Sequence, residues 1–107
     1  MKRLLISAAA CRDRDAIDDY TAEQFGVDQS QRLRDAFEIA LKNLQRVPGA
    51  GRARPEMSPV GRQFRSVVVL GAFLIVYEVV DDMVRIARIL HAARDLPSEL
   101  VLDDGSE

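Results

Sequence analysis

The side chains most able to do chemistry gather near the end of the last apolar run. His91 is the only histidine of the chain, and Arg85 and Arg88 precede it on the same segment. Arginine is a permanent fork-shaped donor and histidine exchanges protons near neutral pH, so together they could hold a phosphodiester and supply a proton. Arg65, on an earlier run, could join them. If the chain cleaves phosphodiesters, His91, Arg65 and Arg88 are the candidate catalytic residues, and we commit to no catalytic residue otherwise.

A structural role for these residues is the competing interpretation, and we favour it because a functional site needs several convergent groups. His91 could bond the backbone at the sheet edge, and the arginines could pair with Asp81, Asp82 or Glu78. Strict alternation would place Arg85, Ala87, Ile89 and His91 on one face, and Val84, Ile86, Arg88 and Leu90 on the other. Each face mixes arginine with aliphatic residues, so alternation does not say which one is buried.

A second group of cations surrounds the segment 48–62. Its three prolines and three glycines predict a loop with no regular element. Between positions 46 and 65 the chain has a single acidic residue, Glu56, and five arginines, namely Arg46, Arg52, Arg54, Arg62 and Arg65. A loop of this length suggests a role, and the clustered charge suggests an anionic partner.

Other classes of site find no support. The glycines at 49, 51 and 61 lack the spacing of a phosphate loop. A single cysteine, Cys11, excludes an internal disulfide and a multi-cysteine metal site, and we expect it to be a small buried residue. A lone histidine does not make a metal site. We predict no metal and no cofactor.

Strands and helices must position these groups. The apolar runs 67–70, 73–80 and 83–91 predict an antiparallel meander, with a turn at Asp81-Asp82 where one residue needs a positive φ. A first strand is expected over Arg3–Ser7, and Ser7 can cap a helix over 8–25. The apolar stripe of that helix would be Ala16, Ile17 and Tyr20.

A second helix follows closely. Gly26 can end the first helix with Val27 as its closing contact, and Asp28 with Gln31 resembles a capping box for the next. Pro48 stops this second helix. Its spacing places one apolar face along Leu33, Ala36, Phe37, Ala40, Leu41 and Leu44.

This order predicts an α+β fold, βααβββ, with an antiparallel helical hairpin on one face of the sheet. We expect residues 1–95 to form one domain, with fifteen basic and thirteen acidic residues, and 96–107 to form an acidic C-terminal extension. The other sheet face should be bare, or covered by this extension or another polypeptide. No run approaches the ~20 apolar residues of a membrane helix. The apolar run 4–6 is too short for a signal peptide, so we expect a cytoplasmic protein.

Several stretches carry a family resemblance, namely Gly51-Arg52, Gly61–Phe64, Phe73–Tyr77, Val84–Ile86 and Arg88–Leu96. With them the chain resembles, over roughly residues 3–97, the RelE/ParE family of bacterial toxins from type II toxin–antitoxin modules. The similarity is greatest to the ParE-like branch. The resemblance implies a growth-inhibiting toxin held inactive by a cognate antitoxin in a hetero-oligomer.

Two mechanisms occur in that family. ParE-type members poison DNA gyrase by protein–protein contact and need no catalytic residues, whereas RelE-type members cleave messenger RNA on the ribosome. With net charge −2 and two lysines, the chain offers little for RNA binding, so we favour gyrase and a non-enzymatic action. An mRNA endonuclease using His91, Arg65 and Arg88 is the alternative, and a degenerate toxin that only binds its antitoxin is a third. Candidate target contacts are Arg52, Arg54, Arg62, Arg65, Arg85, His91 and Arg94.

Overall fold

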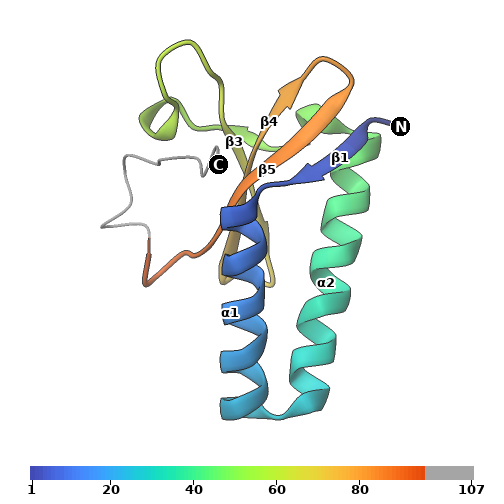
Figure 1. Cartoon of the computed structure of the whole chain (residues 1–107), viewed down its shortest axis with the longest axis vertical. Helices are drawn as coiled ribbons and strands as arrows, with labels where there is room; N and C mark the ends of the chain where they lie inside the picture. The colour runs from blue at the N-terminus through green and yellow to red at the C-terminus, as the bar shows by residue number, and fades with distance from the viewer. Residues whose placement is uncertain (96–107) are drawn as a thin grey trace.

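The computed structural model describes residues 1–95, whose helices and sheet form two layers (Figure 1). The elements are β1 (Arg3–Ile6), α1 (Ala8–Phe25), α2 (Val27–Arg46), β2 (Arg52–Ala53), β3 (Arg65–Val69), β4 (Phe73–Val80) and β5 (Met83–His91). Short 3-10 turns, η1 (Pro48–Ala50) and η2 (Pro55–Met57), flank β2. The predicted α+β order is confirmed, and the acidic extension 96–107 lies outside the described residues.

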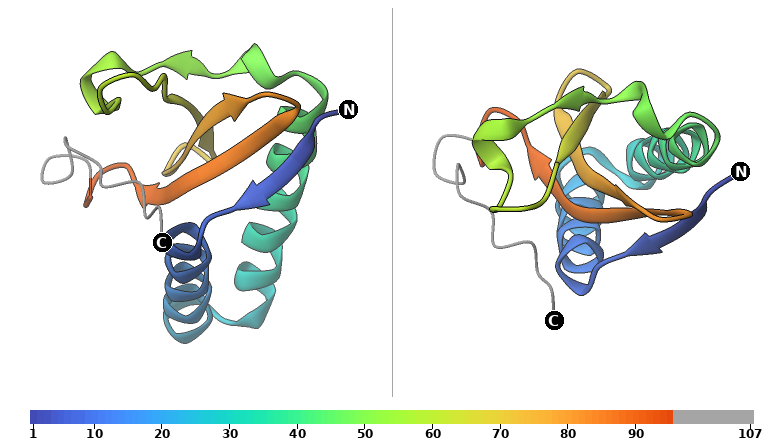
Figure 2. Two further views of the ribbon diagram at one scale, coloured as in Figure 1. Left: turned by 45° about the horizontal axis from the view of Figure 1, so that its top comes forward. Right: turned by 90° about the horizontal axis from the view of Figure 1, so that it is seen from above.

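The sheet runs in the order β1-β5-β4-β3-β2 (Figure 2). Strands β3, β4 and β5 form the predicted antiparallel meander, and Asp81 takes the positive φ of 55° expected at its turn. Strand β1 pairs with β5 in parallel, with Arg3 opposite Met83. The first strand is thereby placed beside the last one.

The core between the layers follows the predicted face of α2. Leu33, Phe37, Leu41 and Leu44 are each at most 4% exposed, and Ala36 and Ala40 pack against the same cluster. The stripe predicted for α1 is wrong, because Ala16 and Tyr20 are exposed and of the three only Ile17 is buried. The buried row of α1 instead follows Ala10, Ile17 and Thr21, at spacings of seven and four residues that keep one helix face inward.

The predicted caps of α1 are confirmed at both ends, since Ser7 precedes it and Gly26 follows it at positive φ, but the predicted N-terminal cap of α2 is not. The Ser7 hydroxyl accepts a hydrogen bond from Ala10 N–H (3.0 Å) and donates one to Ala87 O (2.8 Å), so it caps α1 and ties it to β5. The capping box at Asp28 is wrong: only Gly26, at φ +92°, separates the two helices, and α2 already begins at Val27, which is exposed. Gln31 bonds Asp35 and Arg34 instead.

The 48–62 segment is more ordered than its composition predicts. Arg52 and Ala53 form β2 opposite Ser66 and Arg65, and Arg54 N–H continues the pairing to Phe64 O at 2.8 Å. Proline directs this segment into short turns without preventing two residues between them from pairing at a sheet edge.

The second sheet face is partly covered by the chain itself, contrary to the expectation of a bare face. Met57 and Phe64 fold back and pack against residues of β4 and β5, and the resulting buried cluster contains Met57, Phe64, Leu74, Val76, Ala87 and Leu90. Phe64 is 1% exposed. The segment that carries Met57 and Phe64 therefore covers part of this face.

Strand β5 carries a bulge that alternation could not predict. Val76 of β4 pairs with Arg88 but the next residue, Tyr77, pairs with Ile86, so Ala87 is an extra residue. Before the bulge, Val84 and Ile86 face the helices; after it, Ile89 does. The two sets predicted to share faces are therefore each split at Ala87.

Candidate functional site

The three residues proposed for phosphodiester chemistry do not converge. Arg65 pairs with Tyr77 at one end of β4, and His91 pairs with Phe73 at its other end. Tyr77 and Phe73 both pack in the helix-side core, and four strand positions of ~3.3 Å each separate them by about 13 Å. Arg88 pairs with Val76, which belongs to the cluster on the opposite face.

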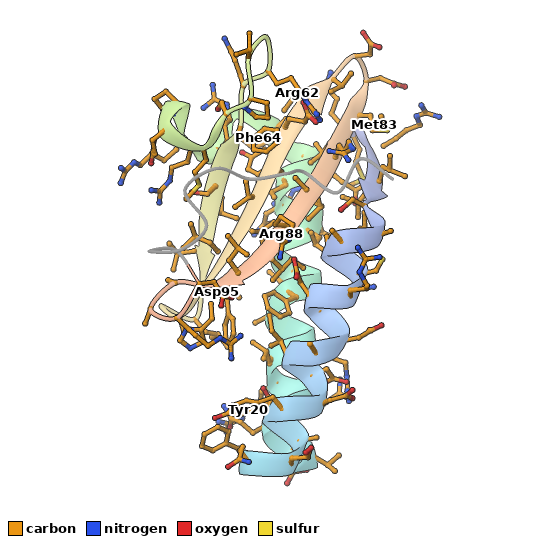
Figure 3. The ribbon with its side chains drawn as sticks, turned by 60° about the vertical axis from the view of Figure 1, so that its left-hand side comes forward. Tyr20, Arg62, Phe64, Met83, Arg88 and Asp95 are labelled. Atoms are coloured by element: carbon orange, nitrogen blue, oxygen red, sulfur yellow. The ribbon has the colours of Figure 1, made fainter. Side chains whose placement is uncertain are left out.

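Arg88 is bound to α1. Its Nε and one terminal nitrogen donate to the two carboxylate oxygens of Asp13 at 2.7 and 3.0 Å, and Ile89 N–H donates to the same carboxylate at 3.0 Å. Arg88 lies beside α1 in Figure 3. The carboxylate thus joins the helix to the part of β5 that β1 does not cover, so Arg88 has a structural role, although its partner is not the one expected from sequence.

His91 is part of the turn that ends β5. Its Nδ1 accepts from Arg94 N–H at 3.2 Å, its backbone N–H donates to Asp95 Oδ2 at 2.8 Å, and its ring contacts Phe73 edge-on at 5.3 Å. Arg94 Nε donates to Asp95 Oδ1 at 3.0 Å. This arrangement matches the structural interpretation, in which His91 serves the sheet edge.

Replacing Asp95 with asparagine is expected to lower stability near neutral pH and to matter little in acid. Partial burial raises the pKa of Asp95, but hydrogen bonds from Arg94 and from His91 N–H, with the charge of Arg94, outweigh it and leave the pKa below its usual value. A carboxyl group whose pKa is lowered by folding stabilises the fold at pH values above its unfolded pKa of ~3.9. This stabilisation is lost as the pH falls through the lower pKa of the folded state. Thermal unfolding at pH 6 and pH 3.5 checks this, and a difference in Tm that does not shrink in acid would contradict it.

Arg62 and Arg85 share one buried carboxylate. Glu78, 5% exposed, accepts from Arg62 Nε at 3.1 Å and from Arg85 at 3.1 Å, and its second bond to Arg62 completes a fork. Arg62 also lies over the Phe64 ring, 5.4 Å from its centroid. The predicted pairing of Arg85 with Glu78 is confirmed. Arg62 comes from the loop, so this cluster fastens the loop to the sheet.

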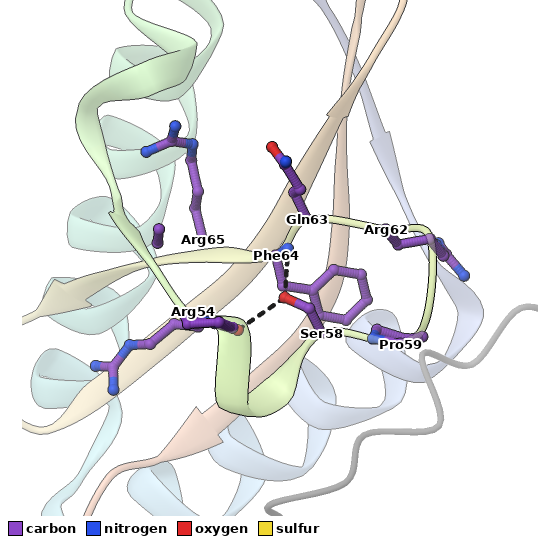
Figure 4. Close-up of a pocket in the computed structure, with 9 residues that line it drawn as sticks. Arg54, Ser58, Pro59, Arg62, Gln63, Phe64 and Arg65 are labelled. Atoms are coloured by element: carbon purple, nitrogen blue, oxygen red, sulfur yellow. Dashed lines mark hydrogen bonds between the residues drawn. The ribbon is translucent and has the colours of Figure 1, made fainter.

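The remaining loop arginines are held to different degrees. Arg54 Nε donates to Ser66 Oγ at 2.8 Å and its terminal nitrogen reaches Glu56 at 3.3 Å. Arg65 donates to Gly51 O at 2.9 Å, on the helix side. Arg52 is exposed on β2. Figure 4 shows Arg54, Arg62 and Arg65 around a hollow of about 420 Å³, and the structure thus gathers three predicted contacts in one region.

Tyr77 is a positioning residue that sequence reasoning missed. It is fully buried, its hydroxyl donates to Pro48 O at 2.7 Å, and Gly51 N–H donates to it at 2.8 Å. Burial raises the pKa of Tyr77, although the Gly51 bond and the charge of Arg65 act in the opposite direction. The hydroxyl fixes the start of the arginine-bearing segment, and a hydroxyl-bearing aromatic residue within the apolar run 73–77 was the available signal.

An apolar groove lies at the far end of the helical hairpin. Two hollows of about 420 and 190 Å³ share Thr21, Phe25 and Phe73 in their walls. At this end Tyr20, Phe25 and Leu70 are each more than half exposed. We call this feature the hairpin groove, and its composition suits an aliphatic segment of another polypeptide.

Comparison with known proteins agrees with this geometry. Residues 4–96 match the family model described as "ParE toxin of type II toxin-antitoxin system, parDE". The chain belongs to the ParE toxin family. A solved structure described as "Chromosomal ParDE TA system from P. aeruginosa" is similar to this ParE toxin at 26% identity and a TM-score of 0.70, covering 85% of this chain and 96% of that one. The search of curated proteins returned no match.

Family membership settles the broad function. The protein is a ParE-type toxin of a type II toxin–antitoxin system, and such a system implies an antitoxin partner. Within residues 1–95, no helix is long and apolar enough to cross a membrane.

Proposed function

We propose that this ParE toxin inhibits growth by binding DNA gyrase and that a cognate antitoxin neutralises it in a hetero-oligomer. The observation that carries the proposal is the separation of His91, Arg65 and Arg88. A ribonuclease needs such groups within reach of one phosphate. Arg65 on β3 and His91 on β5 have β4 between them and are also offset along the strands by four residues, about 13 Å at ~3.3 Å per residue, and Arg88 pairs at a position of the other face. The mRNA endonuclease alternative is accordingly less well supported.

Binding without chemistry suits the arrangement of the arginines. Arg54 and Arg62 are fastened by Ser66 and Glu78, so little side-chain freedom is lost when a partner is bound. Arginines held in place are typical of protein interfaces, where they are enriched at energetically important positions. Arg52, Arg54, Arg62, Arg65, Arg85, His91 and Arg94 remain the proposed contacts, with the loop arginines at the centre and His91 and Arg94 at the distant end of β5.

For the antitoxin we propose the hairpin groove together with the outer edge of β3. Within residues 1–95, β2 pairs with Arg65 and Ser66 alone, and beyond them Val68 and Leu70 are 59% and 62% exposed. An extended aliphatic segment could add a strand along this edge and place a side chain in the groove, whose wall includes Leu70. This position leaves the arginine loop to the target, whereas His91 and Arg94, which line the hairpin groove, would be covered by the antitoxin.

The decisive experiment measures two activities of the purified toxin separately, negative supercoiling by DNA gyrase and translation in a cell-free extract. We expect loss of supercoiling with translation intact, full relief by the antitoxin, and several-fold weaker inhibition by Arg52→Ala with unchanged Tm. Inhibition of translation first, abolished by His91→Ala, would replace gyrase with the ribosome as the target.

A further inference from the structure

The loop 54–64 has the architecture of a rigid platform. Its ends meet at the Arg54 N–H to Phe64 O bond of 2.8 Å. Inside it, the Ser58 hydroxyl donates to Arg54 O at 2.7 Å and accepts from Phe64 N–H at 2.9 Å, as the dashed lines in Figure 4 show. Met57 and Phe64 are buried, and Arg62 is bound to Glu78. Loops closed and packed by their own side chains in this way are frequently functional.

The tip of this loop presents one valine to solvent. Arg62 N–H donates to Pro59 O at 3.0 Å, closing a four-residue turn, and Gly61 in its third position has φ +81°, as a type II turn requires. Val60 in the second position is 103% exposed, as open as in an extended peptide. It makes no contribution to either core cluster. An aliphatic side chain that a fixed turn holds in solvent buries no surface and so does not stabilise the fold.

The two neighbours of this valine in the sequence, Pro59 and Gly61, line two different hollows. One contains Ser58, Pro59 and Arg62 in its wall, and the other, of about 730 Å³, contains Gly61, Arg62 and the exposed Val79 and Val80 of the β4 end. Val60 therefore stands on a ridge between two depressions, with Arg62 common to both. Arginine is enriched at protein interfaces, and an apolar side chain beside it can lie in the apolar core of a contact that has a polar rim.

We propose that Val60 is the apolar anchor of the target interface, and that its partner is a protein surface with a shallow apolar socket rimmed by carboxylates. The carboxylates would complement Arg52, Arg54 and Arg62, and the socket would cover the valine. A single-stranded nucleic acid fits less well, because bases stack on aromatic side chains rather than on valine. This inference rests on the proposed function and specifies the surface that performs it.

The test compares Val60→Asp with Val27→Asp. Val27 is also an exposed valine, 71% exposed, but it lies at the turn between α1 and α2, at the opposite end of the molecule from the loop (Figure 1). We expect Val60→Asp to weaken inhibition of supercoiling at least about fivefold, as for an interface anchor worth more than ~1 kcal/mol. Its Tm and its affinity for the antitoxin should match those of the wild type, and Val27→Asp should inhibit fully.

Full inhibition by Val60→Asp would overturn the inference while leaving the proposed function intact. Loss of antitoxin affinity in Val60→Asp, with inhibition of gyrase unchanged, would assign the ridge to the antitoxin instead and also overturn it. If the wild type blocks translation rather than supercoiling, the gyrase proposal fails, and the same pair of variants in the translation assay then decides whether Val60 anchors that target.

Discussion

Replacing Gly51 with alanine is expected to destabilise the toxin by about 3 kcal/mol. A Cβ at this position would lie 2.5 Å from the Tyr77 hydroxyl oxygen, 2.7 Å from a ring carbon and 2.9 Å from Ser66 O. Two of these atoms belong to the fully buried Tyr77 side chain and the third to the backbone of a strand. Neither the side chain nor the strand can move away without a cost in stability. Overpacking costs about 1–3 kcal/mol, and displacing Tyr77 would also weaken its bonds to Pro48 and Gly51, each worth about 1 kcal/mol.

Gly49→Ala is the matched control. An added Cβ there meets nothing within 4 Å, and the glycine lies two residues away in the same segment. Its Tm should be close to that of the wild type, since Gly→Ala at an unstrained surface position changes stability by only about 0.5 kcal/mol. Urea unfolding followed by circular dichroism measures both variants. Equal stability of the two would mean that the Tyr77 contacts do not hold the loop.

Glu78→Gln is the second large effect, with an expected loss of about 3 kcal/mol. The substitution keeps the shape of the side chain but removes the negative charge between Arg62 and Arg85. Taking one partner from a buried ion pair costs about 3–5 kcal/mol, and the lower end applies because the Arg62 side chain is 32% exposed. The loop 54–64 would lose its fastening to β4, so inhibition of the target should weaken together with stability.

Glu56→Gln controls for the loss of a loop carboxylate. Glu56 also pairs with an arginine, Arg54, but it lies on the surface, where such pairs contribute little. We expect Glu56→Gln to unfold at the wild-type temperature and to retain inhibition. Thermal unfolding combined with limited proteolysis of the loop distinguishes the two variants, and a loop equally protected in both would show that Glu78 is not its fastening.

Periodicity was sufficient for the main elements because each buries one continuous row. The six apolar positions of α2 and the three apolar runs of the meander could be placed from sequence, and so could the Ser7 cap. The α1 stripe could not, since Tyr20 is amphipathic and its exposure depends on how the helix is rotated against β5. Strand β2 was invisible because its two residues pair through backbone alone.

The sequence predicted which residues contribute to the candidate site, but not how those residues are arranged in space. Three of the five arginines of the 46–65 segment line one hollow. Which partner holds each arginine of the chain depends on tertiary contacts, such as that of Arg88 with Asp13, 75 residues apart. Because of the bulge at Ala87, the residues that follow it in β5 point to the opposite sheet face from the one that alternation predicts. No local sequence pattern in β5 predicts the bulge. The exposure of Val60 at the tip of the loop could not be predicted, because a valine among prolines and glycines has no sequence signal that distinguishes it from other loop residues.

The parallel pairing of β1 with β5 dictates when this toxin can become active. Arg3 can pair only once Met83 is made, and the Ser7 hydroxyl bonds the Ala87 carbonyl 80 positions later, so β5, an interior strand of the sheet, is the last of the five to be synthesised. Chains rich in such distant contacts fold slowly. A ribosome making this polypeptide therefore carries a chain that cannot complete its sheet until β5 has been made, and truncated products lacking β5 should be unable to inhibit growth.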